Sequence, residues 1–114
     1  FARSSDLAPR RMTGRITVQR FNMYYVYILL LNNNQFYTGS TDDLKRRVSE
    51  HKLGKVKATT QRRPLKIIHY EAYLLKSDAQ RRERYLKTTE GKYFLKQQIR
   101  DLLKKIDQNH SGIV

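Results

Sequence analysis

The chain contains no cysteine and no tryptophan, two prolines and five glycines, and its 114 residues include only 10 acids against 24 lysines and arginines. Without cysteine it forms no disulfide, uses no thiol nucleophile and binds no zinc through thiolates. No apolar run approaches the ~20 residues that span a bilayer. No stretch of residues 1–22 resembles the apolar core of a secretory signal. These absences predict a cytoplasmic chain that does not cross a membrane.

What the chain has in excess is positive charge, with a formal net charge of +14 at pH 7. A surface of this kind attracts polyanions. Basic residues occur in clusters with aromatic residues among them, which favours nucleic acid as the partner, DNA more than RNA, over an anionic membrane. The alternative is a generally basic surface that only keeps the protein in solution.

The composition changes near residue 22, which suggests where the folded domain begins. Residues 1–22 carry five arginines and one aspartate but few large apolar side chains. We expect them to be a basic leader, either added to the chain or upstream of a natural start at Met23; an ordered basic arm is the alternative. A single domain is then predicted over residues 23–106, followed by a flexible tail at 107–114.

Hydrophobic periodicity predicts three strands and three helices. The strands are expected at 24–31, 35–38 and 66–74, and the helices at about 42–53, 77–88 and 92–106. Gly39 is expected to end the second strand, and Gly54 the first helix. The predicted order is β-β-α-β-α-α, an α+β domain with a small three-stranded antiparallel sheet.

Helix caps and turns are predicted from local signals. An asparagine turn at 32–34 joins the first two strands. Ser40 or Thr41 is the expected cap of the first helix, and Ser77 with Gln80 matches a capping box. The last helix has an apolar stripe that predicts one continuous buried face, formed by Leu95, Ile99, Leu102 and Ile106.

Two charged side chains lie next to apolar stripes. Glu83 falls between Ala79 and Leu86 on one helix face, where an unpaired carboxylate is costly and calls for a cation or a metal. Arg47 and His51 flank the buried face of the first helix. The alternatives are a structural ion pair for Glu83 and, for Arg47, a surface arginine with a buried stem.

Two tyrosines complete a possible reactive set. Tyr27 lies on the first strand and Tyr37 at the end of the paired strand, where packing alone would also explain a tyrosine. Arginine binds phosphate through two parallel hydrogen bonds, and a carboxylate suits Mg²⁺. Tyr27, Tyr37, Arg47 and Glu83 are therefore sufficient in kind for metal-assisted hydrolysis of a phosphodiester.

The order of these residues resembles the GIY-YIG nuclease superfamily over about residues 23–99. Tyr25-Val26-Tyr27 and Tyr37-Thr38-Gly39 are similar to its paired tripeptides. The run 43–47 is similar to its N/D-L-x-x-R helix, and 79–87 to its A-x-x-x-E segment. Residues 62–64 and 70–72 are similar to the small single-domain bacterial members. Tyr25 stands in place of the usual glycine, Thr38 in place of isoleucine, and Ser40 where the excinuclease of nucleotide excision repair carries a lysine.

The resemblance implies a nuclease that uses one divalent cation, Mg²⁺ or Mn²⁺. By position, Glu83 matches the metal-binding carboxylate, Arg47 the phosphate-binding arginine and Tyr27 the proposed general base. Tyr37 matches the second tyrosine. His51 falls where several members place an active-site histidine, and it is the rival base because histidine titrates near neutrality.

We therefore predict an endonuclease that hydrolyses phosphodiester bonds in DNA during repair or processing. No base-reading module is present, so selectivity for structure is expected rather than for sequence. Nucleic acid is expected to contact the basic clusters at Lys45, Arg46, Lys52, Lys55, Lys57, Arg62, Arg63 and Arg82. The alternatives are a non-catalytic nucleic-acid binder on the same fold and a basic module that docks an acidic protein.

Overall fold

The computed structural model describes residues 22–111, with side chains described for 22–108; the predicted leader lies outside this range except for Asn22. Three antiparallel strands in the order β2-β1-β3 form the sheet. They are β1 (Tyr24–Leu30), β2 (Phe36–Thr41) and β3 (Lys66–Tyr73). The helices are α2 (Leu44–Lys52), the short 3₁₀ helix η1 (Thr60–Arg62), α3 (Lys76–Leu86), α4 (Thr89–Gln98) and α5 (Arg100–Ser111). The α+β class is confirmed, with one more α-helix than predicted.

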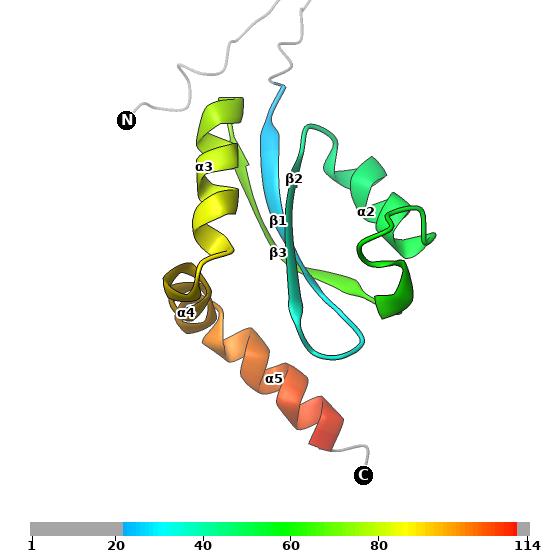
Figure 1. Cartoon of the computed structure of the whole chain (residues 1–114). Coiled ribbons are helices and arrows are strands. Elements are labelled where there is room, and N and C mark those ends of the chain that lie inside the picture. The colour runs from blue at the N-terminus through cyan, green and yellow to red at the C-terminus, as the bar shows by residue number, and fades with distance from the viewer. Residues whose placement is uncertain (1–21, 112–114) are drawn as a thin grey trace, which may run out of the picture.

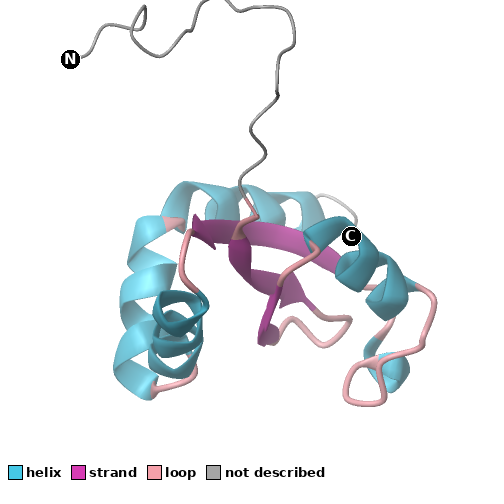
Figure 2. Cartoon of the chain, turned by 90° about the horizontal axis from the view of Figure 1, so that it is seen from above, coloured by secondary structure: helices cyan, strands magenta, loops and turns pink. Residues whose placement is uncertain are grey.

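Helices cover both faces of the sheet (Figures 1 and 2). Successive side chains of the central strand β1 point to opposite faces of the sheet. Because helices cover both faces, the strand is buried on both sides. Val26 and Ile28 pack with residues of α3 and α4, whereas Tyr27 and Leu29 pack with Leu65 and Leu44 on the other side. No helix of the described residues is both long and apolar enough to cross a bilayer.

The hairpin of β1 and β2 brings Tyr27 directly opposite Gly39. The turn between them uses Asn34 in the left-handed region, with φ of 67°, as asparagine tolerates. β2 does not end at Gly39 as predicted, because its pairing with β1 continues to Thr41. A Cβ atom at Gly39 would overlap the hydroxyl of Tyr27. The missing side chain therefore makes the space that the phenol occupies at this edge strand.

α2 begins one residue after Asp43, whose side chain accepts a hydrogen bond from the Arg46 backbone N–H at 3.1 Å. The predicted caps, Ser40 and Thr41, are wrong because both residues still belong to β2. Thr41 instead accepts a bond from the Asp43 N–H at 3.0 Å. The helix stops before Gly54, as expected, where φ is +80°.

The last three helices differ most from the prediction. α3 starts at Lys76 without a side-chain cap, because Ser77 is already helical. The single helix expected at 92–106 is two helices: Thr88 caps α4, and the chain turns at Ile99 before α5. The predicted stripe is therefore split, with Leu95 buried and Leu102 exposed.

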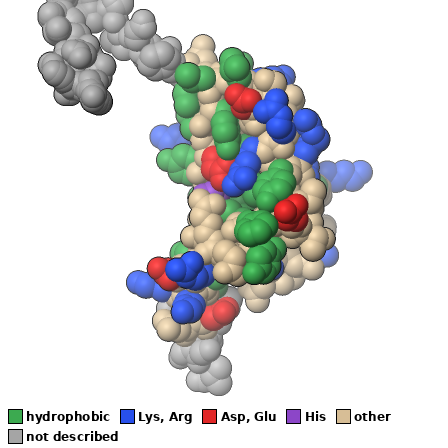
Figure 3. Space-filling view, turned by 90° about the vertical axis from the view of Figure 1, so that its left-hand side faces the viewer, with side chains coloured by type: hydrophobic (Ala, Val, Ile, Leu, Met, Phe, Trp, Pro, Cys, Tyr) green, Lys and Arg blue, Asp and Glu red, His purple; other side chains and the backbone are tan. Residues whose placement is uncertain are grey.

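A carboxylate on β3 ties the sheet to α3. Glu71 accepts hydrogen bonds from Arg82 at 2.9 and 3.2 Å and from the Tyr73 hydroxyl at 2.7 Å, and it contacts His69 Nε2 at 2.9 Å. Burial raises the pKa of Glu71, but these hydrogen bonds outweigh it and lower that pKa to about 2. On the side where α3 and α4 lie, basic, acidic and histidine side chains are grouped among apolar ones (Figure 3).

Acid should weaken the fold through Glu71. Because its pKa in the folded chain lies below the ordinary 4.5, its stabilisation is present above pH 4.5 and is lost as the pH falls toward 2. The difference in unfolding free energy between wild type and Glu71→Gln should shrink by up to about 3 kcal/mol over that window. Urea unfolding at several pH values measures it. The exposed Glu90→Gln is the control, and a difference independent of pH would contradict the assignment.

Adding a methyl group at Gly39 should destabilise the hairpin. Gly39→Ala forces the new Cβ against the Tyr27 phenol, and such overpacking costs about 1–3 kcal/mol. In a Tyr27→Leu background the same change should cost much less, because the two sites are coupled through this contact. Thermal unfolding of wild type, the two single variants and the double variant measures the coupling, with Tyr93→Leu as the control background. Additive effects of Gly39→Ala and Tyr27→Leu would show that the contact is not the cause.

Candidate active site

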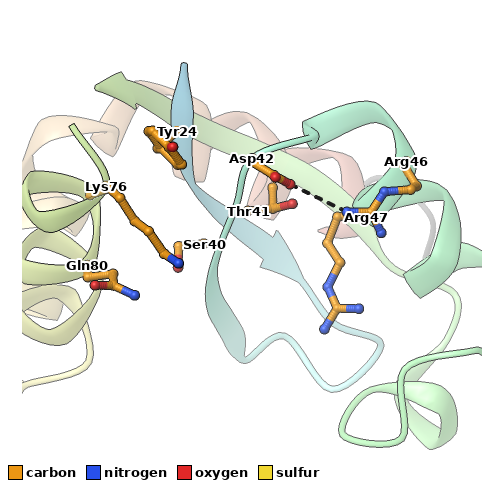
Figure 4. Close-up of a pocket in the computed structure, with 9 residues that line it drawn as sticks. Tyr24, Ser40, Thr41, Asp42, Arg46, Arg47, Lys76 and Gln80 are labelled. Carbon is orange, nitrogen blue, oxygen red and sulfur yellow. Dashed lines mark ion pairs between the residues drawn. The ribbon is translucent and has the colours of Figure 1, made fainter. Parts of the chain in front are cut away.

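A polar hollow of about 380 Å³ lies across the edge strand β2, between α2 and α3. It is lined by Tyr24, Ser40, Thr41, Asp42, Arg46, Arg47, Lys76, Ala79 and Gln80. Arg46 and Arg47 reach it from α2, Lys76 and Gln80 from α3, and Ser40 lies on β2 between them (Figure 4). β2 is at the edge of the sheet, so both flanking helices can contribute side chains to the same opening.

Glu83 lies beside this hollow on α3. Its carboxylate accepts a 2.6 Å hydrogen bond from the Ser40 hydroxyl and forms a 3.0 Å ion pair with Lys87. The side chain is 20% exposed, so solvent still reaches the carboxylate. The neighbouring Ala79 and Leu86 are buried as predicted. Glu83 is thus a partly desolvated carboxylate held by a hydroxyl of the edge strand and by one exposed lysine.

Arg47 points into the hollow from α2 (Figure 4). Its guanidinium donates a 2.9 Å hydrogen bond to Glu50 and its side chain is 35% exposed. The hydrogen bond from Arg47 to Glu50 raises the Arg47 pKa and lowers that of Glu50. Arg47 is therefore a permanent, oriented cation with donors still available to an anion.

Tyr27, His51 and Thr59 form a buried chain of polar groups under the site. The Tyr27 hydroxyl lies 2.9 Å from His51 Nε2, and His51 Nδ1 lies 2.7 Å from the Thr59 hydroxyl. All three residues are at most 1% exposed. Burial and the nearby Arg47 lower the pKa of His51, whereas Glu50 raises it. His51 is therefore a neutral imidazole at neutral pH, with both ring nitrogens engaged.

The pKa of Tyr27 shows which charges act on its phenol. Burial raises that pKa, Arg47 lowers it, and Tyr37 and Glu83 raise it by smaller amounts, with a net value of about 12. Arg47 and Glu83, two residues that the sequence analysis singled out, therefore both perturb the pKa of this phenol. The Tyr37 ring lies 6.4 Å from the Tyr27 ring and 5.1 Å from that of His51, centre to centre. Tyr27 lies beneath the surface, while Arg47 and Glu83 reach solvent.

The donors at the site fit a hard divalent cation. Among residues 22–111, no three His, Cys, Asp or Glu side chains converge as a metal cage. Mg²⁺ does not need such a cage, because it keeps several waters and is often held by one or two carboxylates together with substrate phosphate. The Glu83 carboxylate, with the Ser40 hydroxyl 2.6 Å away, supplies oxygen ligands of that kind.

The eight predicted nucleic-acid contacts do not lie together. Arg46 lines the hollow, whereas Lys45 and Lys52 line a separate depression between α2 and β3. Arg82 is held by Glu71, and Arg63 donates to the carbonyls of Thr60 and Lys52 and packs against Gly54. Both side chains thus have partners within the fold, although Arg63 is exposed and Arg82 is partly so. The remaining exposed residues are Lys55, Lys57 and Arg62.

The structure adds residues to the site that the sequence analysis did not single out for it. Lys76 and Gln80 lie seven and three residues before Glu83 on the same helix, a spacing that places them on one face. From the sequence alone, that spacing could have pointed to Lys76 and Gln80 as neighbours of Glu83. Thr59 carried none, because it comes from the loop after α2 and meets His51 only through the fold.

Comparison with known proteins places the chain in a family. Residues 23–98 match the model of the GIY-YIG catalytic domain. A UPF0213 protein of Listeria welshimeri is 41% identical over 63 residues, covering 54% of this chain and 70% of that protein. One of Halobacterium salinarum is 41% identical over 66 residues, covering 57% and 86%.

A solved structure is also similar: a UPF0213 protein of Bacillus halodurans, determined by solution NMR. It shares 36% sequence identity with a TM-score of 0.43, over 64% of this chain and 81% of that one. The match to the domain model extends from the start of β1 to the end of α4 and so contains every side chain of the site described above. The chain belongs to the GIY-YIG catalytic domain family.

Proposed function

We propose that the chain is a divalent-metal-dependent endonuclease that hydrolyses phosphodiester bonds in DNA. The family is generally one of endonucleases. The observation that supports the proposal most directly is the juxtaposition of a cation, a carboxylate and a phenol. Arg47 and Ser40 line one hollow, and Ser40 holds the Glu83 carboxylate at 2.6 Å. The Tyr27 phenol packs against Gly39, the neighbour of Ser40 on β2. DNA rather than RNA as substrate, selectivity for structure, and a role in cytoplasmic repair or processing are further parts of the proposal.

Arg47 is proposed to bind the scissile phosphate. Its exposed guanidinium donates to a non-bridging oxygen and offsets the negative charge that grows on the phosphoryl group in the transition state. Glu50, which already holds Arg47 at 2.9 Å, keeps the guanidinium in place as a positioning residue. Because the donors are aimed before the substrate arrives, little reorganisation is needed during the reaction.

Tyr27 and His51 are proposed to move the proton of the attacking water. Water gives a proton to the Tyr27 oxygen as the Tyr27 hydroxyl proton passes to His51 Nε2, 2.9 Å away. The hydroxide attacks phosphorus, the bond to the leaving oxygen breaks, and that oxygen takes a proton from solvent. His51 accepts at Nε2 when its other nitrogen, Nδ1, donates to Thr59, 2.7 Å away. Thr59 therefore sets the tautomer.

Glu83 is proposed to hold the divalent cation, which supplies charge stabilisation at the phosphate and at the leaving oxygen. Ser40 orients the carboxylate through its 2.6 Å hydrogen bond. In this arrangement Ser40 positions Glu83, whereas Tyr27, Arg47 and Glu83 meet the reacting atoms.

A second function is favoured by one observation, the 1% exposure of Tyr27. A buried phenol reaches water only if a side chain above it moves. If none moves, the hollow binds nucleic acid without cutting it. Cleavage with and without EDTA, beside a binding assay, separates the two functions.

Glu83→Gln should abolish cleavage while leaving binding nearly unchanged. The substitution removes the proposed metal ligand but keeps the shape of the side chain. Nicking of supercoiled DNA in Mg²⁺ and in Mn²⁺ measures activity, and fluorescence anisotropy in EDTA measures binding. Glu90→Gln, an exposed acid on α4, is the control and should cut like wild type. Equal cleavage by Glu83→Gln and wild type would remove Glu83 from the mechanism.

Removing the Tyr27 hydroxyl should reduce kcat by about 10²-fold or more, with folding preserved. Tyr27→Phe keeps the ring and deletes only the group that carries the proton; the exposed Tyr70→Phe is its control. Because the pKa of His51 is lowered, the acid limb of kcat/KM in wild type should have its midpoint below the ordinary histidine value of about 6.5. A pH profile measures it. If Tyr27→Phe cleaved DNA with the wild-type kcat, the hydroxyl would have no part in the reaction and Tyr27 would serve packing only.

A further inference from the structure

Two side chains of α3 point into the hollow without a partner. Lys76 extends toward Ser40, and Gln80 lies beside it one turn later (Figure 4). Both are exposed, and within residues 22–108 neither side chain has a hydrogen bond or an ion pair. They contrast with Arg47 and Glu83, whose charges are met by Glu50 and Lys87.

The backbone positions of Lys76 and Glu83 are separated along the helix, although the Lys76 side chain extends toward Ser40. The two residues are seven positions apart on α3, which corresponds to about 10 Å of helix axis at 1.5 Å per residue. Gln80 lies between them on the same face. Lys76 and Gln80 enter the hollow from α3, whereas Arg47 enters it from α2 on the other side of β2, so the two sets of donors face different parts of a bound anion chain.

The charge around Lys76 favours an anionic ligand. The acid that lines the hollow is Asp42, and it pairs with Arg46 at 3.6 Å, as the dashed line in Figure 4 shows. The hollow therefore carries positive charge from both α2 and α3. An ammonium with three donors and an amide NH₂ group match the oxygens of a phosphate.

We propose that Lys76 and Gln80 form a second phosphate subsite, which binds a backbone phosphate next to the scissile one on the same strand. The inference rests on the proposed function and adds to it, because a strand held at two phosphates is gripped within its length rather than only at the reacting bond. A strand of nucleic acid fits better than an acidic peptide, because its phosphates continue at regular spacing from the site at Arg47. Lys76 then contributes to substrate binding and not to the chemical step.

Binding without turnover tests the subsite. The probe is a fluorescein-labelled 20-nucleotide single-stranded DNA in EDTA, with anisotropy measured across a range of salt concentrations. Lys76→Gln should weaken binding about fivefold at low salt and should reduce the slope of log K against log salt by about 0.7, the loss of one phosphate contact. Lys76→Arg should restore most of the affinity. The control is Lys92→Gln, an exposed lysine on α4 outside the hollow, which should leave the slope unchanged.

Short ligands locate the effect. NMR titration with a thymidine dinucleotide, which has one phosphate, and with a trinucleotide, which has two, should show that only the trinucleotide affinity falls in Lys76→Gln. In cleavage assays the same variant should raise KM and leave kcat near wild type. An unchanged salt slope in Lys76→Gln, or equal losses for both ligands, would overturn the subsite and leave the nuclease proposal standing. Wild type that fails to bind DNA at all would overturn both.

Discussion

The contact between Tyr27 and Gly39 organises the site. A phenol from the central strand reaches the sheet edge only where the edge strand has no side chain. At that contact the hydroxyl lies 2.9 Å from His51 Nε2, and Arg47 lowers the pKa of the phenol whereas Glu83 raises it. Two helices that cover opposite faces of the sheet thereby contribute charges to one opening.

The excess of positive charge is used in two distinct ways. Some arginines serve the architecture: Arg82 meets Glu71 between α3 and β3, and Arg63 packs against Gly54 in the loop that carries Thr59. Others line the hollow: Arg46 pairs with Asp42 and Arg47 with Glu50, and both guanidinium groups have further donors for an anion. Net charge therefore indicates a polyanionic partner, but the partners of each lysine and arginine within the fold decide where a polyanion can bind.

The α+β class and the antiparallel hairpin could be predicted, and Arg47 and Glu83 could be singled out, because each has a local signal. A continuous run rich in Tyr, Val, Ile and Leu predicted β1, and a carboxylate within an apolar stripe singled out Glu83. The helix ends were less predictable. Ser77 matched a capping box but lies inside α3, and the stripe from Leu95 to Ile106 reads as one helix although the chain turns at Ile99. These boundaries depend on how α4 packs against α3, which the sequence pattern does not encode.

The order of residues along the chain was enough to single out the candidate reactive groups: two phenols, a guanidinium, an imidazole and a carboxylate. Their ionisation states and partners came from the packing of those elements. That packing buries His51 between Tyr27 and Thr59 and brings the Ser40 hydroxyl within hydrogen-bond distance of the Glu83 carboxylate. It also places Lys76 across the hollow from Arg47. No local pattern could supply these features, because burial and pairing arise between elements far apart in the chain, and they set pKa values and access to solvent.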